Sequence, residues 1–133
     1  MKLQTTKPRP STRWAWKGRR RSVHELRAAL ERRDSALLES LLGPDIAVVV
    51  ESGAEEAPTI RMVRGAYDAV PLLMHGLASR PGLAIAEREV DGQAGLVVRG
   101  GGAAPIAVTV DFTGRLIATL WIRLGRVSVS ARL

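Results

Sequence analysis

Residues 83–99 read LAIAEREVDGQAGLVVR and place an Asp-Gly pair between two runs of apolar and β-branched residues. An Asp-Gly pair in this setting favours a two-residue type I′ turn, so the segment predicts a β-hairpin. If the turn holds only Asp91 and Gly92, Val90 pairs with Gln93 across it. The rest of the predicted fold is arranged around this hairpin.

A second hairpin follows in the next part of the chain. Its strands are predicted at 105–112 and 115–124, with Thr113 and Gly114 as the turn. A two-residue turn there pairs Phe112 with Arg115, Val110 with Ile117, Val108 with Thr119 and Ile106 with Trp121. Together with strands at 83–90 and 94–99, these segments predict an antiparallel meander of four strands.

The chain before the meander predicts three helices and one more hairpin. Ser22 and Glu25 have the spacing of a capping box, which indicates a helix start, and apolar residues follow every three or four positions. Asp34 can cap a short second helix, and Asp68 a third helix in which Pro71 would fall in the first turn. These patterns predict helices at 23–33, 35–42 and 68–80 and strands at 45–51 and 59–64. Helices that cover one antiparallel sheet predict an α+β fold.

The formal net charge of +7 comes from the start of the chain. Residues 1–23 hold eight of the 20 basic residues and none of the 13 acidic ones. Because the first 21 residues also lack apolar periodicity, we predict a disordered basic arm at 1–21 before a single domain at 22–133. Two roles stay open for the arm: a solvated tail or linker remnant, which we favour, or a contact with nucleic acid or another polyanion. The second role would use Trp14, Trp16, Lys17, Arg19, Arg20 and Arg21.

Composition excludes several kinds of chemistry. There is no cysteine, which excludes disulfides, thiolate metal sites and cysteine nucleophiles. The two histidines have no suitably spaced carboxylates, so no metal site is predicted. Neither face of the second predicted hairpin places two titratable groups together, so no catalytic residue is predicted, and no cofactor is expected. No apolar run approaches the roughly 20 residues of a membrane span, and the basic N-terminus lacks the apolar core of a signal peptide. We therefore expect a cytoplasmic protein with no membrane contact.

An ordered set of short motifs gives the chain a family resemblance. The set consists of Leu41-Leu-Gly-Pro-Asp45, Val63-Arg-Gly-Ala66, Gly76-Leu-Ala78, Val90-Asp-Gly-Gln93 and Gly114-Arg-Leu-Ile117. From about Val23 to Leu124 the chain resembles the SnoaL-like branch of the nuclear transport factor 2-like superfamily. Within it, the chain is most similar to the C-terminal SnoaL-like domain of actinobacterial extracytoplasmic-function sigma factors. The resemblance implies a cystatin-like cone, in which a curved antiparallel sheet wraps around three helices, and frequently a pocket at the open end and a homodimer through the sheet.

For function, the resemblance and the predicted register favour a non-catalytic binding or regulatory domain related to the accessory domain of those sigma factors. Its pocket would take a small apolar ligand and would be lined by Tyr67, His75, Val108, Val110, Ile117 and Trp121. Two alternatives stay open: a small isomerase, cyclase or hydrolase of the SnoaL or ketosteroid-isomerase kind, and a nucleic-acid accessory protein that acts through the arm. The chain lacks the promoter-recognising domains, so we expect a free-standing paralogue, a split partner or a fragment of a sigma factor. Its partner in transcription regulation would be a sigma factor or an RNA polymerase component.

Overall fold

The structure, a computed structural model, describes residues 13–54, 57–90, 92–102 and 104–124. Three helices and six strands follow one another along this part of the chain. In order they are α1 (Arg13–Arg32), α2 (Ser35–Leu41), β1 (Leu42–Ala54), β2 (Ala57–Arg64), α3 (Ala66–Gly76), β3 (Ala84–Val90), β4 (Gln93–Arg99), β5 (Ile106–Thr113) and β6 (Leu116–Leu124). Every predicted element is present, and the ends differ from the prediction by a few residues except at the start of α1.

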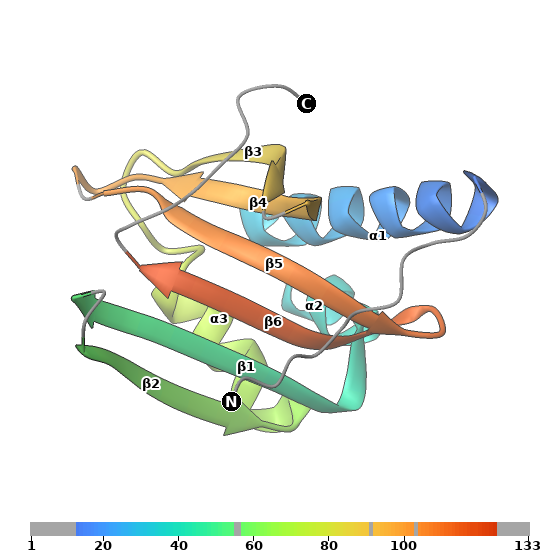
Figure 1. The fold of residues 1–133 in the computed structure, drawn as a ribbon, viewed down its shortest axis with the longest axis horizontal. Helices are drawn as coiled ribbons and strands as arrows, with labels where there is room; N and C mark the ends of the chain where they lie inside the picture. Colours follow the sequence, from blue (N-terminus) through green and yellow to red (C-terminus); the bar gives the residue numbers. More distant parts are fainter. Residues whose placement is uncertain (1–12, 55–56, 91, 103, 125–133) are drawn as a thin grey trace.

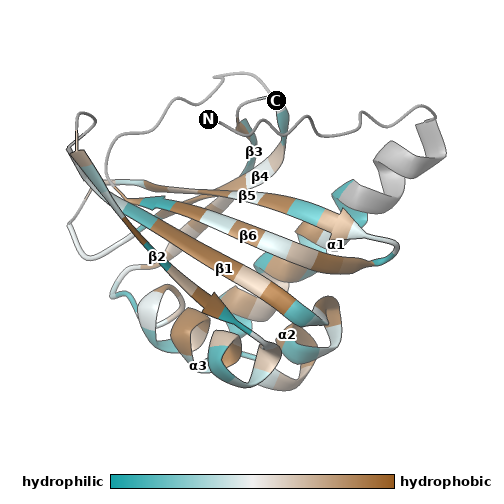
Figure 2. Cartoon of the chain, turned by 60° about the horizontal axis from the view of Figure 1, so that its bottom comes forward, coloured by the Kyte–Doolittle hydropathy of each residue, from teal (hydrophilic) through white to brown (hydrophobic). Residues whose placement is uncertain are grey.

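The strands form one curved sheet in the order β2-β1-β6-β5-β4-β3 (Figure 1). Neighbouring strands are antiparallel except β1 and β6, which pair in parallel near the centre of the sheet. This parallel pair, which the sequence pattern did not predict, joins the early β1–β2 hairpin to the later meander. The helices all lie on one face, and the sheet bends around them (Figure 2). The predicted α+β cone is confirmed.

We call the face of the sheet that contacts the helices the inner face, and the opposite face the outer face. Helix α3 packs against β1 and β2, α1 packs against β3 and β4, and α2 contacts both other helices. Aliphatic side chains from the two layers fill the space between them, and the largest fully buried ones include Leu26, Leu38, Leu73, Leu96 and Leu120. Burying a side chain of this size contributes roughly 1.5–3 kcal/mol, so this layer holds the cone together.

Helix α1 begins at Arg13 and not at the predicted residue 23. Ser22 therefore lies inside the helix and does not cap it, and residues 13–21 of the predicted disordered arm are helical. Arginine, lysine and alanine are good helix formers, so the helix continues through the capping-box spacing. Residues 1–12 lie outside the described residues, and their disorder stays a prediction. No helix in the described ranges is both long and apolar enough to cross a membrane.

The two other predicted helix starts have different outcomes. Asp34 caps α2 as expected, because its carboxylate accepts a 3.0 Å hydrogen bond from the backbone N–H three residues later. Helix α3 begins at Ala66, after Gly65 with a φ of +89°, and not after Asp68. Pro71 therefore lies beyond the first turn, where its missing N–H costs the helix one backbone hydrogen bond.

The two hairpins of the meander differ in how well their register was predicted. In the first, the pairing across the Asp-Gly turn is confirmed. In the second, Thr113 pairs with Leu116, and a β-bulge separates the pairs made by Asp111 and Phe112. A bulge adds one residue to one strand, and a shift of one residue turns every later side chain to the opposite face. The two-residue turn is also Gly114-Arg115 and not the predicted Thr113-Gly114, so the predicted pairing is wrong on both sides of the bulge. Trp121, which lies beyond the bulge, is on the outer face.

Candidate functional site

Three of the six residues predicted to line a pocket are packed into the core. Val108, Val110 and Ile117 lie on the inner face, as predicted, and are 1%, 4% and 0% exposed. They belong to one hydrophobic cluster with residues of all three helices. Ile117 also adjoins a cavity of about 220 Å³ beside the β5–β6 turn, whose other walls include Pro44 and Leu116. The main contribution of these three side chains is therefore to packing.

The other three predicted pocket residues lie in different places. Trp121 is on the outer face because of the bulge, and its Nε1–H donates a 3.0 Å hydrogen bond to Glu51 Oε1. Tyr67 is 91% exposed near the start of α3, and His75 is exposed near its end. The structure thus does not bring the six residues together around one cavity. The assumption of an unbulged strand explains the wrong face for Trp121, whereas Tyr67 and His75 are exposed on α3 whatever the register of β6.

A different cavity, which we call the α1 cleft, opens between α1 and the β3–β4 hairpin. Its volume is about 190 Å³, and its walls are formed by Arg20, Val23, Glu87, Arg88, Glu89, Ala94 and Gly95. Val23 forms the apolar floor of the cleft on the helix side, where it is 1% exposed and packs into the core. The small side chain of Ala94 leaves space on the opposite wall. The cleft therefore combines apolar surface with charged groups of both signs.

The alternation of β3 explains why carboxylates face this cleft. Glu87 and Glu89 share the inner face with Ile85, which is 5% exposed and packs into the core. Both glutamates lie farther along the strand, toward the hairpin turn. Strand β3 is the last strand in the sheet order. Near the hairpin turn its inner face is open to water, since Glu89 is exposed and Glu87 is partly exposed. The charged side chains can therefore face α1 without being fully buried.

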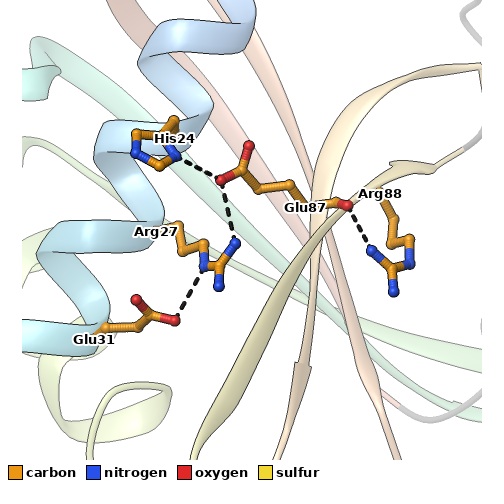
Figure 3. Close-up of polar contacts among 5 residues, drawn as sticks. All are labelled: His24, Arg27, Glu31, Glu87 and Arg88. Atoms are coloured by element: carbon orange, nitrogen blue, oxygen red, sulfur yellow. Dashed lines mark hydrogen bonds and ion pairs between the residues drawn. The ribbon is translucent and has the colours of Figure 1, made fainter. Parts of the chain in front are cut away.

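Glu87 is held by two side chains of α1 (Figure 3). Its Oε2 lies 2.8 Å from His24 Nδ1 and 3.4 Å from an Nη of Arg27. Arg27 also donates a 3.0 Å hydrogen bond through Nε to Glu31. The bond to Glu31, with a smaller contribution from Glu87, raises the pKa of Arg27 above its ordinary value. Such exposed contacts contribute about 0–1 kcal/mol each to stability. The two contacts of Glu87 connect β3 to α1 beside the cleft.

This cluster was not predicted from the sequence. His24, Arg27 and Glu31 are spaced by three and four residues, which places them on one face of a helix. That spacing is visible in the sequence and could have identified the helical half of the cluster. Glu87 lies more than 50 residues later, and only the packing of β3 against α1 brings it to His24.

The residues predicted for a polyanion contact lie on α1. Arg20 and Arg21 are exposed, and Arg20 also lines the cleft. The backbone of Trp14, Trp16, Lys17 and Arg19 is part of α1, but their side chains lie outside the described part of the structure. Within the described residues, no three His, Asp or Glu side chains are grouped so that they could hold a metal ion.

Comparisons with known proteins identify the fold. No family model matches the chain, and no curated protein matches its sequence. A ketosteroid isomerase-like protein from Kribbella flavida matches its structure with a TM-score of 0.60 at 12% identity, over 84% of this chain and 81% of that one. A nuclear transport factor 2-like protein of unknown function from Cytophaga hutchinsonii gives a TM-score of 0.58 at 11% identity, over 94% and 95% of the two chains. This chain has the nuclear transport factor 2-like fold.

The same nuclear transport factor 2-like fold occurs in a sigma factor. The extracytoplasmic function sigma factor SigJ of Mycobacterium tuberculosis matches with a TM-score of 0.61 at 22% identity. The match covers 81% of this chain but only 42% of SigJ, so the two share one region of the longer protein. At these identities the likeness establishes the fold, and the activity must be argued from the residues of this chain.

Proposed function

We propose that this chain is a non-catalytic ligand-binding or regulatory domain and that its ligand occupies the α1 cleft. The observation that carries the proposal is the composition of the cleft, where Val23, Ala94 and Gly95 lie between charged groups of both signs. Binding sites for small molecules are typically concave and mainly apolar, with a few polar groups that fix the orientation of the ligand. The cone interior in the described part is instead filled by aliphatic side chains.

The size and charge of the cleft define a class of ligand. A volume of about 190 Å³ is below the roughly 300–1,000 Å³ of sites that enclose drug-sized molecules, so the ligand would be a single ring or a short chain. Arg27, which also pairs with Glu31, partly compensates the charge of Glu87. Arg20 is exposed at the cleft and can pair with an anionic group. We therefore propose a small, mainly apolar ligand that carries one carboxylate.

Benzoate and benzylamine are matched probes for this proposal, because they are similar in size and opposite in charge. We expect benzoate to shift the NMR signals of backbone amides in the β3–β4 hairpin and in α1 around Arg20, and benzylamine to have little effect. Arg20→Gln should weaken benzoate binding about tenfold, the cost of roughly one charge-assisted hydrogen bond. Arg32→Gln removes the same charge from the exposed far end of α1 and should leave the affinity unchanged. Equal losses in the two variants would contradict the proposal.

We further propose that the domain acts in transcription regulation, with a sigma factor or an RNA polymerase component as its partner. The similarity to SigJ supports this setting. Size-exclusion chromatography of the purified chain with purified RNA polymerase, with and without an extracytoplasmic-function sigma factor, tests it. A complex in either mixture is the expected result, and separate elution in both would contradict it.

A homodimer through the outer face is a third part of the proposal. Ile60 and Met62 are each 55% exposed there, and Trp121 lies two strands away on the same face. Exposed apolar groups gathered on one face are typical of protein interfaces. Sedimentation at micromolar concentration should give the mass of a dimer, and Met62→Asp should give that of a monomer. A monomeric wild-type chain would contradict the homodimer and leave the other two parts of the proposal unaffected.

Two alternative functions each have an observation in their favour. For an enzyme, the second ring nitrogen of His24 points away from Glu87 (Figure 3), and an imidazole held in this way can accept a proton. Isomerase or hydrolase turnover that His24→Ala abolishes would support it. For a polyanion-binding protein, Arg20 and Arg21 are exposed on one helix that carries further basic residues. Binding of a DNA oligonucleotide that weakens steeply with added salt would support that alternative.

A further inference from the structure

Strand β2 is an edge strand, and the direction of its backbone groups can be assigned. Among the described strands it pairs with β1 alone and ends the sheet order (Figure 1). The N–H of Gly65 donates a 2.8 Å hydrogen bond to the carbonyl of Ile46, which continues the register of the β1–β2 pair by one step. Hydrogen-bonded pairs in an antiparallel ladder recur at every second residue. The N–H groups directed toward β1 are therefore those of Ala57, Thr59, Arg61 and Val63, and those directed away are those of Ile60, Met62 and Arg64.

Pro58 fits the same alternation. It falls at a position whose nitrogen faces away from β1, where a proline removes no hydrogen bond from the ladder. The outward side of β2 consequently offers N–H donors at Ile60, Met62 and Arg64, with the carbonyl groups of the same residues between them. This is the pattern of donors and acceptors that a further strand would need.

The side chains of β2 favour a particular kind of partner. Seven of the eight positions of the strand are exposed. Ile60 and Met62 lie on the outer face and are each 55% exposed, whereas the exposed Arg61 lies on the inner face. Arg61 and Arg64 are the charged residues of the strand, so its edge is basic. Exposed edges with apolar side chains are sites of strand addition unless the protein protects them.

We propose that the β2 edge binds an extended segment of a partner protein by strand addition, and that this segment alternates apolar and acidic residues. Directly opposed side chains on neighbouring strands lie about 5 Å apart on the same face of the sheet. The apolar residues of the segment would therefore lie beside Ile60 and Met62 on the outer face. Its acidic residues would lie beside Arg61 on the inner face, where they gain an opposite charge.

The same geometry disfavours a second copy of this chain as the occupant. Two β2 strands that paired antiparallel about a two-fold axis near Arg61 would bring the two Arg61 side chains to opposite or diagonal positions. Diagonal neighbours are about 7–8 Å apart, and opposed like charges destabilise a strand pair. An acidic segment instead compensates the charge of Arg61. The β2 edge therefore favours a different protein over a second copy of this chain.

The side-chain part of the proposal is tested with a fluorescently labelled seven-residue peptide in which valine and glutamate alternate. We expect it to bind the full chain, measured by fluorescence anisotropy, and a peptide with lysine in place of glutamate to bind about tenfold more weakly. Arg61→Glu should reverse this preference. Arg99→Glu makes the same change of charge at an exposed site on β4, away from β2 in the sheet, and should preserve it. Equal affinity of the two peptides for the wild-type chain would overturn the proposal.

The backbone part is tested by removing one outward N–H. Met62→Pro should abolish peptide binding, whereas Met62→Ala keeps the N–H and should retain it. If Met62→Pro reduces folding, a peptide N-methylated at every residue tests the backbone hydrogen bonds with the wild-type chain and should not bind, because neither of its edges keeps an N–H donor. Retained binding of the N-methylated peptide would overturn the proposal. A homodimer through the outer face would respond to both Met62 variants, which separates it from strand addition.

Discussion

The β-bulge in the second hairpin decides which face each residue of β6 occupies, and two adjacent alanine substitutions test it. With the bulge, Leu120 lies on the inner face and is 1% exposed, and Thr119 lies on the outer face opposite Asp111. Leu120→Ala removes three carbon atoms, a transfer cost of about 2.4 kcal/mol at roughly 0.8 kcal/mol per buried CH₂. The cavity that remains adds to this, so we expect a loss of about 3–4 kcal/mol in the free energy of unfolding. Thr119→Ala should cost less than about 1 kcal/mol.

Urea denaturation followed by circular dichroism measures both effects. With an m-value of about 1.5 kcal/mol/M, Leu120→Ala should lower the midpoint by roughly 2 M, and Thr119→Ala by less than about 0.7 M. An unbulged strand would place Thr119 inside and Leu120 outside, which reverses the order of the two losses. Equal losses, or a larger one for Thr119→Ala, would therefore refute the observed register.

Three further experiments test local features of the structure. Asp34→Ala should destabilise the domain by about 1 kcal/mol in thermal unfolding, because it removes the N-cap of α2, and an unchanged midpoint would contradict the cap. A double-mutant cycle on His24 and Glu87 should give a coupling of at most about 1 kcal/mol that decreases at high salt; a salt-independent coupling would show that the contact is more than an exposed ion pair. Gly95→Ala should cost about 1–3 kcal/mol, because its Cβ would clash with the backbone carbonyl oxygen of Val108 on β5, whereas Gly76→Ala, which meets nothing within 4 Å, should cost no stability. Similar stability of the two glycine variants would contradict the close approach of β4 and β5.

The fold was predictable where a local sequence pattern is compatible with only one local structure. The Asp-Gly turn fixed the first hairpin of the meander, and Asp34 marked the start of α2. The second hairpin was not predictable to the same degree, because β6 has apolar residues at both odd and even positions, including Ile117, Leu120 and Trp121. Either face of such a strand could lie against the core, and a bulge of one residue decides which face does.

The candidate site was less predictable than the fold because it depends on contacts between distant segments. Alternation within β3 shows that Glu87 and Glu89 share one face, but it does not show that α1 lies against that face. The predicted pocket depended on the unbulged register, so its Trp121 was assigned to the wrong face. The parallel pairing of β1 with β6 was missed for a related reason, since strands far apart in the sequence leave no local signal of their pairing.

Ligand binding in the α1 cleft is tested most directly by filling the cleft. Ala94 is partly exposed on its wall, so Ala94→Leu should occupy the cavity of about 190 Å³ while leaving the core intact. In an NMR titration with benzoate, the wild-type chain should show saturable shifts in the β3–β4 hairpin and in α1. The folded Ala94→Leu variant should show none. Saturable binding of benzoate to Ala94→Leu with the wild-type affinity would contradict binding in this cleft.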